Sequence, residues 1–365
     1  MSRSDRPKLP PVRIVRIAEA VRAGIANLNR RLVPAPVGVL EMATGFASAQ
    51  ALFAAARLGV ADALADGPLS PSDIAARIGT DPDATARLLR YLASFSVFGP
   101  LPDGRYELTS MSEALRTDSP TSVRPLLTML GHPSYWGAWG QLEYSMQSGA
   151  PSIDKLHGRP LFEHLQKDVE FGAVFNAGMT CVAEMNTPPI LSAYDFTKFA
   201  TIVDVGGGQG SLLASILRDS PDSRGVLFEL ESVARDARPV IDEAGVADRC
   251  SIEVGSFFES VPTGADLYLL MHIVHDWNDE KALEILQNVR ASIEPGGTLL
   301  VIEDVIPEGN RPHAGKMLDL DMLLFVGGKE RTAAEYRDLL GRAGFRLTRI
   351  VPTVAPACLV EAVPA

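Results

Sequence analysis

The stretch Ile202-Val-Asp-Val-Gly-Gly-Gly-Gln-Gly-Ser211 decides the fold of this chain. Its first half is apolar and β-branched, which predicts a short strand, and its glycines end that strand abruptly. Residues 212–218 then have helical character. A strand, a glycine turn and a helix N-terminus together make a nucleotide site, because glycines let the backbone approach a ligand closely. We therefore expect an α/β domain that binds a nucleotide cofactor at this turn.

The glycine spacing and a downstream acid narrow the choice of nucleotide. A dinucleotide fingerprint that uses Gly206 and Gly208 requires a third glycine at position 211, where the chain has Ser211. This argues against NAD. Residues 225–230 read as a second strand that contains Glu229, at about the distance at which an acidic side chain holds ribose hydroxyls. A plain structural turn is the alternative for the glycines alone, and Glu229 weakens that alternative.

A second informative segment follows the apolar run of residues 265–271, which reads as a buried strand. It continues as His272-Ile-Val-His-Asp-Trp277. In an open parallel sheet, the carboxyl ends of the strands face the ligand crevice, so these side chains are placed to meet a substrate. His275 is the candidate general base, since the ordinary pKa of imidazole lies near neutrality. The alternative is that His275 merely caps the following helix.

The chain resembles the S-adenosylmethionine-dependent small-molecule O-methyltransferases. This family includes plant caffeate-type enzymes and bacterial polyketide and anthracycline tailoring enzymes. The order and spacing of several short motifs carry the resemblance from about Phe171 to the C-terminus. These motifs are Val203–Gly210, Phe228–Leu230, Gly255–Phe258, His275–Trp277, Pro295–Gly297, Glu303–Asp304 and Gly327–Thr332. The N-terminal half also resembles the dimerisation module of the family.

The resemblance implies roles for individual residues. His275 would be the general base, Glu303 and Glu330 the carboxylates that hold it, and Asp276 a neighbour of the substrate. The implied neighbours of S-adenosylmethionine, and of S-adenosylhomocysteine as product, are Asp204, Gly206, Gly208, Glu229, Ser256, Phe257 and Met271. Phe175 and Met179 would line the substrate chamber. Three positions depart from the family pattern, which usually has aspartate at 229 and 256 and often lysine at 271.

The chemistry can be argued without the family. Methyl transfer from a sulfonium to oxygen is an in-line displacement, so the acceptor hydroxyl must be positioned and must lose its proton. A phenol ionises near the tyrosine value of about 10, which suits an imidazole base. A carboxylate on the other ring nitrogen fixes the tautomer and stabilises the imidazolium. For each glutamate the alternative is a solvated surface charge.

Apolar residues would build the acceptor chamber, because the charges of a phenolate and a sulfonium cancel as they meet. Met179, Met317, Met322 and Phe325 are candidates for its walls. Methionines at helical spacing are more often plain core. We expect residues 131–198, which are rich in aromatic side chains, to contribute further wall.

The expected fold class is an α/β Rossmann-like class I methyltransferase domain preceded by a mostly helical winged-helix dimerisation domain. The expected division is an amphipathic extension at 1–34, the winged-helix domain at 35–130, connecting helices at 131–198 and the cofactor domain at 199–365. Two domains suit the length of 365 residues. In the winged helix, residues 70–78 and 84–96 read as helices, with Asp81 or Asp83 as a cap, and Asp103-Gly104 signals a hairpin.

The N-terminal half also raises questions of partners. The second helix of the winged helix offers only Arg87 and Arg90 beside acidic neighbours, which favours dimerisation over DNA binding. Before it, apolar residues recur at spacings of three and four opposite arginines, from Ile14 to Leu32. Such an amphipathic helix suits packing on a dimer partner, and an anionic membrane surface is the less favoured alternative, because the stripe is narrow and lacks Trp and Phe.

Composition limits the remaining alternatives. A net charge of −11 disfavours a nucleic-acid partner. The three cysteines are too few and too scattered for a disulfide framework or a metal site, and they suit a reducing cytoplasm, as does the lack of a visible secretory signal. We expect a homodimeric O-methyltransferase that acts on a small aromatic hydroxyl compound. The alternatives are a relative that uses the bound sulfonium in hydroxylation or decarboxylation, and a ligand-sensing DNA-binding regulator.

Overall fold

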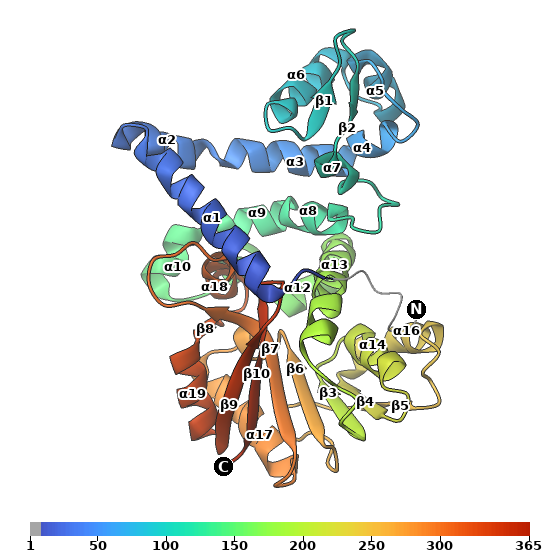
Figure 1. The fold of residues 1–365 in the computed structure, drawn as a ribbon, viewed down its shortest axis with the longest axis vertical. Coiled ribbons are helices and arrows are strands. Elements are labelled where there is room, and N and C mark those ends of the chain that lie inside the picture. Colours follow the sequence, from blue (N-terminus) through green and yellow to red (C-terminus); the bar gives the residue numbers. More distant parts are fainter. Residues whose placement is uncertain (1–8) are drawn as a thin grey trace. The chain divides into compact units, whose positions relative to one another are not determined.

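The structure is a computed structural model, and it describes residues 9–365. Within these residues the chain divides into two compact units (Figure 1). The first unit comprises residues up to Gly24, Leu142–Asp154 and Ala183–Ala365, and the second comprises Ile25–Gln141 and Lys155–Val182. Three helices run across the division, namely α1 (Val12–Arg31), α11 (Ser152–His157) and α13 (Val169–Ala193).

The first unit is built on a sheet that has eight strands within the described residues. The strands are β3 (Thr201–Val205), β4 (Arg224–Glu229), β5 (Cys250–Val254), β6 (Leu267–Met271), β7 (Thr298–Ile306), β8 (Arg331–Thr332), β9 (Phe345–Pro352) and β10 (Ala357–Pro364). Their order is β5-β4-β3-β6-β7-β10-β9, with β8 paired to β7. The first five strands in this order are parallel, and β10 runs antiparallel to β7 and β9.

Helices cover both faces of this sheet (Figure 1). They are α14 (Ser211–Asp219), α15 (Glu231–Ala234), α16 (Ala237–Glu243), α17 (Asp279–Ser292), α18 (Ala314–Phe325) and α19 (Ala333–Arg342), and α10 (Leu142–Ser148) belongs to the same unit. Because successive side chains of a strand point to opposite faces of the sheet, the apolar residues of β6 pack in two separate cores. Leu267 and Leu269 pack in the cluster that contains residues of α14 and α16, while Tyr268 and Leu270 pack in the cluster of α17 and α19.

The strand order reverses at β3, which has β4 on one side and β6 on the other. In such sheets the ligand crevice lies at the carboxyl ends of the strands where the order reverses. The turn that begins at Gly206 follows β3, and the segment that contains His275 follows β6. Both predicted motifs therefore lie at the carboxyl ends of adjacent parallel strands.

One expected strand boundary is wrong. The apolar run of residues 298–302 predicts a strand that ends just before Glu303, but β7 continues to Ile306, so that Glu303 lies inside the strand. The cause is the last strand of the chain, because β10 pairs with β7 at Glu303↔Cys358 and Asp304↔Ala357. A pairing with a strand more than fifty residues away leaves no local signal.

The second unit contains the winged helix. Its elements are α2 (Ala35–Thr44), α3 (Phe46–Leu58), α4 (Val60–Ala63), α5 (Pro71–Ile78), α6 (Pro82–Ala93), β1 (Phe98–Pro100), β2 (Tyr106–Leu108), α7 (Ser110–Glu113), α8 (Arg124–Leu130), α9 (Pro133–Trp139) and α12 (Leu161–Lys167). The predicted caps are confirmed: Ser70 Oγ accepts from Asp73 N, and Asp81 Oδ1 accepts from Ala84 N at 2.8 Å. The hairpin at Asp103-Gly104 joins β1 and β2.

The apolar pattern of residues 52–64 predicts one helix, but the structure has two helices there. Gly59 has φ +71° and separates α3 from α4. This left-handed conformation ends a helix at little cost only in a residue without a Cβ atom. The apolar pattern runs through the glycine, so the pattern predicted one helix where the backbone forms two.

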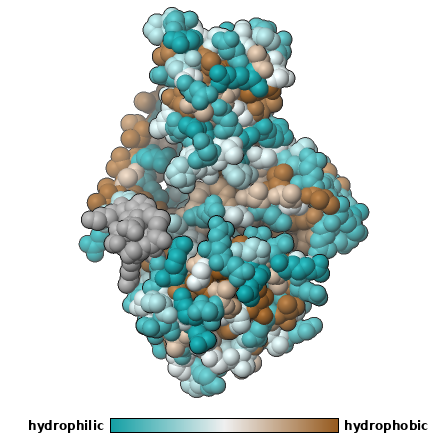
Figure 2. Space-filling view, turned by 90° about the vertical axis from the view of Figure 1, so that its right-hand side faces the viewer, coloured by the Kyte–Doolittle hydropathy of each residue, from teal (hydrophilic) through white to brown (hydrophobic). Residues whose placement is uncertain are grey.

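The N-terminal helices carry much exposed apolar surface. The stripe of α1 forms as predicted, but all six of its apolar residues are more than half exposed, namely Ile14, Ile17, Val21, Ile25, Leu28 and Leu32. Val39, Leu40, Met42 and Phe46 are similarly exposed on α2 and α3. By length and composition alone, residues 35–58 would also suffice to cross a membrane. Figure 2 shows apolar side chains, in brown, at the surface of the face that it draws.

Candidate active site

The segment that follows β6 carries His275, the central residue of the candidate site. After Met271 the chain makes a sharp turn at His272, and residues 274–276 form the short 3-10 helix η2. His275 lies on η2 and is 5% exposed. Asn278, not His275, caps α17, since its side chain accepts from Lys281 N at 3.0 Å. The interpretation of His275 as a helix cap is therefore wrong.

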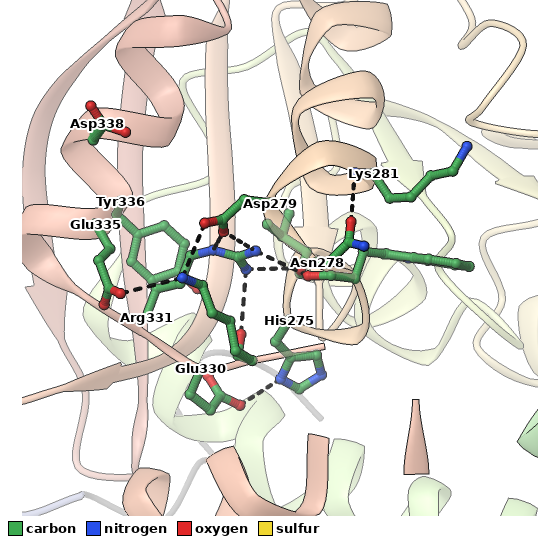
Figure 3. Close-up of polar contacts among 12 residues, drawn as sticks. His275, Asn278, Asp279, Lys281, Glu330, Arg331, Glu335, Tyr336 and Asp338 are labelled. Carbon is green, nitrogen blue, oxygen red and sulfur yellow. Dashed lines mark hydrogen bonds and ion pairs between the residues drawn. The ribbon is translucent and has the colours of Figure 1, made fainter. Parts of the chain in front are cut away.

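Two carboxylates approach the imidazole of His275, and Figure 3 shows the nearer one, that of Glu330. Its Nδ1 lies 2.6 Å from Glu330 Oε1, and its Nε2 lies 3.6 Å from Asp276 Oδ1. The Glu330 side chain is fully buried, so the pair is shielded from water. A carboxylate on Nδ1 fixes the tautomer in which Nε2 is free to accept a proton. Of the two ring nitrogens, Nε2 is thus the one that does not bond to Glu330.

Glu303 holds the backbone of this segment and does not touch the imidazole ring. Its Oε1 accepts from the N–H groups of Ile273, at 3.2 Å, and His275, at 3.0 Å. Its Oε2 accepts from the hydroxyl of Tyr336, which is also buried. This refines the sequence-based expectation that both glutamates hold the imidazole, because only Glu330 contacts the ring.

The carboxylates change the acid–base behaviour of His275. Burial alone would lower the pKa of His275, but the hydrogen bond to Glu330 and the charges of Glu303, Asp276 and Glu330 outweigh burial and raise the pKa to about 10. Burial also raises the pKa of Asp276 to about 6, against the opposing charge of His275. His275 is therefore a stronger base than the ordinary imidazole that the sequence suggested.

A glycine turn brings Glu330 to His275. Met322 O, near the end of α18, accepts from Gly327 N and Gly328 N, and Lys329 N then donates to His275 O at 2.9 Å. A Cβ atom on Gly328 would lie 2.0 Å from His275 O, so only glycine allows this approach. Glu330 lies two residues after Gly328, and its N–H donates to Asp319 Oδ1 at 3.0 Å.

His272 is a further feature of the site that the sequence did not assign. It has φ +54°, a conformation that costs a non-glycine residue roughly 1–2 kcal/mol. Its ring stacks on that of His275, with centroids 5.2 Å apart, and its buried Nε2 has no hydrogen-bond partner among residues 9–365. Burial, and then the charge of His275, lower the pKa of His272 to about 3, so this second imidazole stays neutral.

The glycine turn after β3 has the geometry that a ligand cradle needs. Gly206, Gly208 and Gly210 all have positive φ. A Cβ atom on Gly206 would lie 2.6 Å from Ile273 Cδ1 and 3.4 Å from Phe257 Cε1, whereas a Cβ atom on Gly208 would meet nothing within 4 Å. The backbone at Gly208 thus faces open space, and the turn itself packs against the segment that leads to His275.

Asp204 lies behind this turn. It is 1% exposed, and neither of its carboxylate oxygens has a hydrogen-bond partner among the described residues. A Cβ atom on Gly207 would lie 2.5 Å from Asp204 Cγ. Burial, followed by the charge of Glu229, raises the pKa of Asp204 to about 7. A cofactor contact of Asp204 stays a prediction.

The other predicted cofactor residues lie around the same strand ends. Glu229 ends β4, and it accepts hydrogen bonds from the N–H groups of Leu230 and of Gly208 in the glycine turn. Burial raises the pKa of Glu229 against these bonds. Phe257 packs on Trp277, with ring centroids 6.3 Å apart, Ser256 Oγ accepts from Phe258 N, and Met271 ends β6.

The predicted substrate residues fall in both units. Asp276, Met317 and Met322 belong to the first unit, the two methionines on α18. Phe175 and Met179 belong to the second unit, on α13, where Phe175 packs edge-to-face on Phe171 at 6.1 Å. Whether these residues form one chamber stays a prediction. Phe325, a further candidate for the chamber wall, is buried at the end of α18.

The mostly parallel open sheet and the glycine turn where its strand order reverses define the class of a nucleotide-binding domain with a Rossmann-like fold. Comparison with known protein families identifies the family to which the chain belongs. An O-methyltransferase domain matches residues 139–346, and an O-methyltransferase dimerisation domain matches residues 40–118. The chain belongs to the S-adenosylmethionine-dependent O-methyltransferase family, and S-adenosylmethionine is its cofactor.

Individual relatives agree over nearly the whole chain. Phenazine O-methyltransferase PhzM of Lysobacter antibioticus is 40% identical over 93% of this chain and 99% of its own length. The crystal structure of CalO1, a methyltransferase in calicheamicin biosynthesis with bound S-adenosylhomocysteine, is 38% identical, with a TM-score of 0.83 over 91% of this chain and 98% of that one. Aclacinomycin 10-hydroxylase RdmB of Streptomyces purpurascens is 36% identical over 81% of each chain.

The residues of the first unit fit this cofactor. The open space at Gly208 leaves room for a ligand against the backbone, and Glu229 lies beside the same turn with a carboxylate suited to ribose hydroxyls. Phe257 supplies an aromatic face beside Gly206. The cofactor provides a methyl group on a positively charged sulfur, which makes that methyl group reactive towards an oxygen nucleophile.

Proposed function

We propose that the protein methylates a phenolic hydroxyl of a small aromatic metabolite, with His275 as the general base. The observation that carries this proposal is the buried pair of His275 and Glu330 at the carboxyl ends of the sheet, in which Nδ1 is occupied and Nε2 is left for the acceptor. The name of the phenazine-methylating relative supports an aromatic acceptor. We propose Phe175, Met179, Asp276, Met317 and Met322 as walls of the acceptor chamber.

In this mechanism the residues hold the acceptor and receive its proton. His275 Nε2 takes the proton of the hydroxyl, and Glu330 stabilises the imidazolium that results. Glu303 acts on the backbone, since it holds the N–H groups of Ile273 and His275 and so sets where the ring lies. The direct test is mass spectrometry of a panel of phenols incubated with methyl-labelled S-adenosylmethionine. A product without the labelled methyl group would contradict the proposal.

Cofactor binding is the first property to test. We expect Glu229→Ala to weaken binding of S-adenosylmethionine and S-adenosylhomocysteine by about tenfold or more, because a charged hydrogen bond contributes ~1.5–3 kcal/mol. Isothermal titration calorimetry measures the dissociation constant. Thermal unfolding should show that the variant remains folded.

Glu231→Ala is the matched control, since Glu231 lies two residues further on and its exposed side chain pairs with Arg235 at 3.9 Å. This variant should bind the cofactor as the wild type does. Equal affinity in the wild type and in Glu229→Ala would remove Glu229 from the cofactor site.

We further propose that the protein is a homodimer. The dimerisation domain at 40–118 and the exposed apolar stripe of α1 support this, because a stripe of that kind is unfavourable in water unless it is covered. Multi-angle light scattering at micromolar concentration should give twice the chain mass of 39.1 kDa. Val21→Asp, in the middle of the stripe, should weaken the dimer.

Val254→Asp is the control for that substitution. Val254 is apolar and exposed to a similar degree, 58% against 55% for Val21, but it lies on β5, outside both the stripe of α1 and the dimerisation domain. It should leave the mass unchanged. A wild-type protein that runs only as a monomer would refute the dimer, and equal effects of the two substitutions would refute the role of α1.

Two other functions remain for experiment, and only the first has a specific observation in its favour. The 36% identity to a hydroxylase keeps a reaction that retains the cofactor's methyl group in consideration, and the labelled-methyl assay separates it from methyl transfer. A winged-helix regulator is disfavoured by the pairing of Arg87 with Asp83 at 2.6 Å, and a gel-shift assay at stated salt tests it.

The three free cysteines support a reducing, cytoplasmic location.

A further inference from the structure

Arg331 has an unusual environment for an arginine. It lies on β8 and is fully buried, and it is the largest of the fully buried side chains. A buried guanidinium is tolerated only when its charge and its N–H groups are matched by partners. Asp279 supplies the opposite charge, with its Oδ1 3.1 Å from Nε and 2.9 Å from Nη2.

The remaining N–H groups of Arg331 do not serve a second charge. They donate to three backbone carbonyls: Nη1 to Val274 O at 3.0 Å and Lys329 O at 3.3 Å, and Nη2 to Trp277 O at 3.0 Å. Val274 and Trp277 flank His275 in the sequence, and Lys329 precedes Glu330. One guanidinium therefore joins the segment that carries the base to the turn that carries its carboxylate, as Figure 3 shows.

Charge balance alone does not require this arrangement. Asp279 is itself 43% exposed, so its charge is partly solvated, and Lys329 Nζ also pairs with it at 3.1 Å. The planar fork of arginine is what the three carbonyls need, since a lysine ammonium presents no fixed fan of donors. The contacts with Val274, Trp277 and Asp279 span 52–57 residues of sequence, so they set the position of one loop against another.

We propose that Arg331 is a positioning residue, which keeps Glu330 within hydrogen-bond reach of His275 by bonding the backbone on both sides of the pair. This inference rests on the proposed function for its catalytic meaning. Its structural content, the register of the two loops, is open to test in the protein without any acceptor.

The test compares Arg331→Lys with a matched control, Arg249→Lys, in the full-length protein. Arg249 also donates to three backbone carbonyls, those of Leu217, Ser220 and Ser223, but it lies just before β5, at the other edge of the parallel strands. Both changes keep the positive charge and remove the fork. NMR of histidine-labelled protein, with His275 assigned from the spectrum of His275→Ala, gives the pKa of His275 in each variant.

In Arg331→Lys the pKa of His275 should fall by at least about one pH unit towards the ordinary value near 6.5, because Glu330 is no longer held on Nδ1. In Arg249→Lys it should stay at the wild-type value. Once an acceptor is known, Arg331→Lys should lower kcat by about tenfold or more, with little change in KM for S-adenosylmethionine. A purely structural role would lower thermal stability in both variants and leave the pKa of His275 alone.

An unchanged His275 titration in folded Arg331→Lys overturns the proposal. If that variant does not fold, Asp279→Ala is measured in its place, since it frees Nε and one bond of Nη2 and should also lower the pKa of His275; no change there overturns the proposal equally. Failure of the proposed function is a different result. It appears as a His275→Ala enzyme with wild-type methyl transfer, whatever the titration shows.

Discussion

Replacing His275 by alanine is expected to lower the turnover of a phenol with a pKa near 10 by about 10²- to 10⁴-fold, the usual loss when a general base is removed. The physical reason is that Nε2 is the only nitrogen of the ring left for the acceptor, because Nδ1 is engaged by Glu330 at 2.6 Å. Binding of S-adenosylmethionine should stay near the wild-type value, since the glycine turn and Glu229 remain. Single-turnover rates with labelled cofactor measure the chemical step.

The size of the loss should depend on the acceptor. A phenol that is already ionised at the assay pH needs no base, so His275→Ala should affect it much less. His313→Ala is the control, because that imidazole caps α18 by accepting from Gly315 N and has no contact with His275. A His275→Ala enzyme that methylates a phenol of pKa near 10 at the wild-type rate would eliminate the base and leave positioning alone to explain catalysis.

Local signals in the sequence were enough to predict the strand and glycine turn at Gly206 and the helix cap at Asp81. The strand before Gly206, the glycines with positive φ and the cap at Asp81 each depend on residues within a few positions of one another. Such features follow from turn and cap chemistry, which a single chain displays directly. The candidates His275 and Glu330 were found for a similar reason, since each belongs to a short motif.

The rest of the site depends on pairings between distant segments. Glu303 was expected at a strand end, and β10 extends the strand past it. Arg331 and Tyr336 were not predicted, because the atoms that they contact belong to residues 33–57 positions away. His272 carries no signal of its left-handed backbone in its residue type. The raised pKa of His275 follows from Asp276, its neighbour in the sequence, and from Glu303 and Glu330, which only the fold brings near it.

The raised pKa of His275 leads to an expected pH dependence. A base acts only after it loses its proton, and the pKa of His275 is raised to about 10. The value of kcat/KM should therefore rise with pH between about 7 and 10 and level off above the pKa of the free enzyme's base. An acceptor whose own ionisation lies well outside this range separates the titration of His275 from that of the phenol.

Glu330→Gln should move this rise to lower pH and lower its plateau. The amide oxygen can still accept from Nδ1–H, but the negative charge that helps to raise the pKa of His275 is lost, so the base loses its proton nearer to the ordinary imidazole value of about 6.5. The plateau should fall by between about ten- and about a thousandfold, because no charge on Glu330 stabilises the imidazolium. Near pH 7 the lower pKa of His275 should partly offset the lower plateau. The loss of kcat/KM relative to the wild type should therefore be larger at alkaline pH than near pH 7.

Substitutions of two other glutamates serve as comparisons for Glu330→Gln. Glu303→Gln should give a smaller loss of rate, since an amide oxygen can still accept from the N–H groups of Ile273 and His275. Glu335→Gln should leave the profile unchanged, because Glu335 caps α19 and pairs with Lys329 without touching His275. If Glu330→Gln kept the wild-type profile, Glu330 would not set the basicity of His275. The 2.6 Å contact would then serve only to fill the hydrogen-bonding capacity of a buried pair.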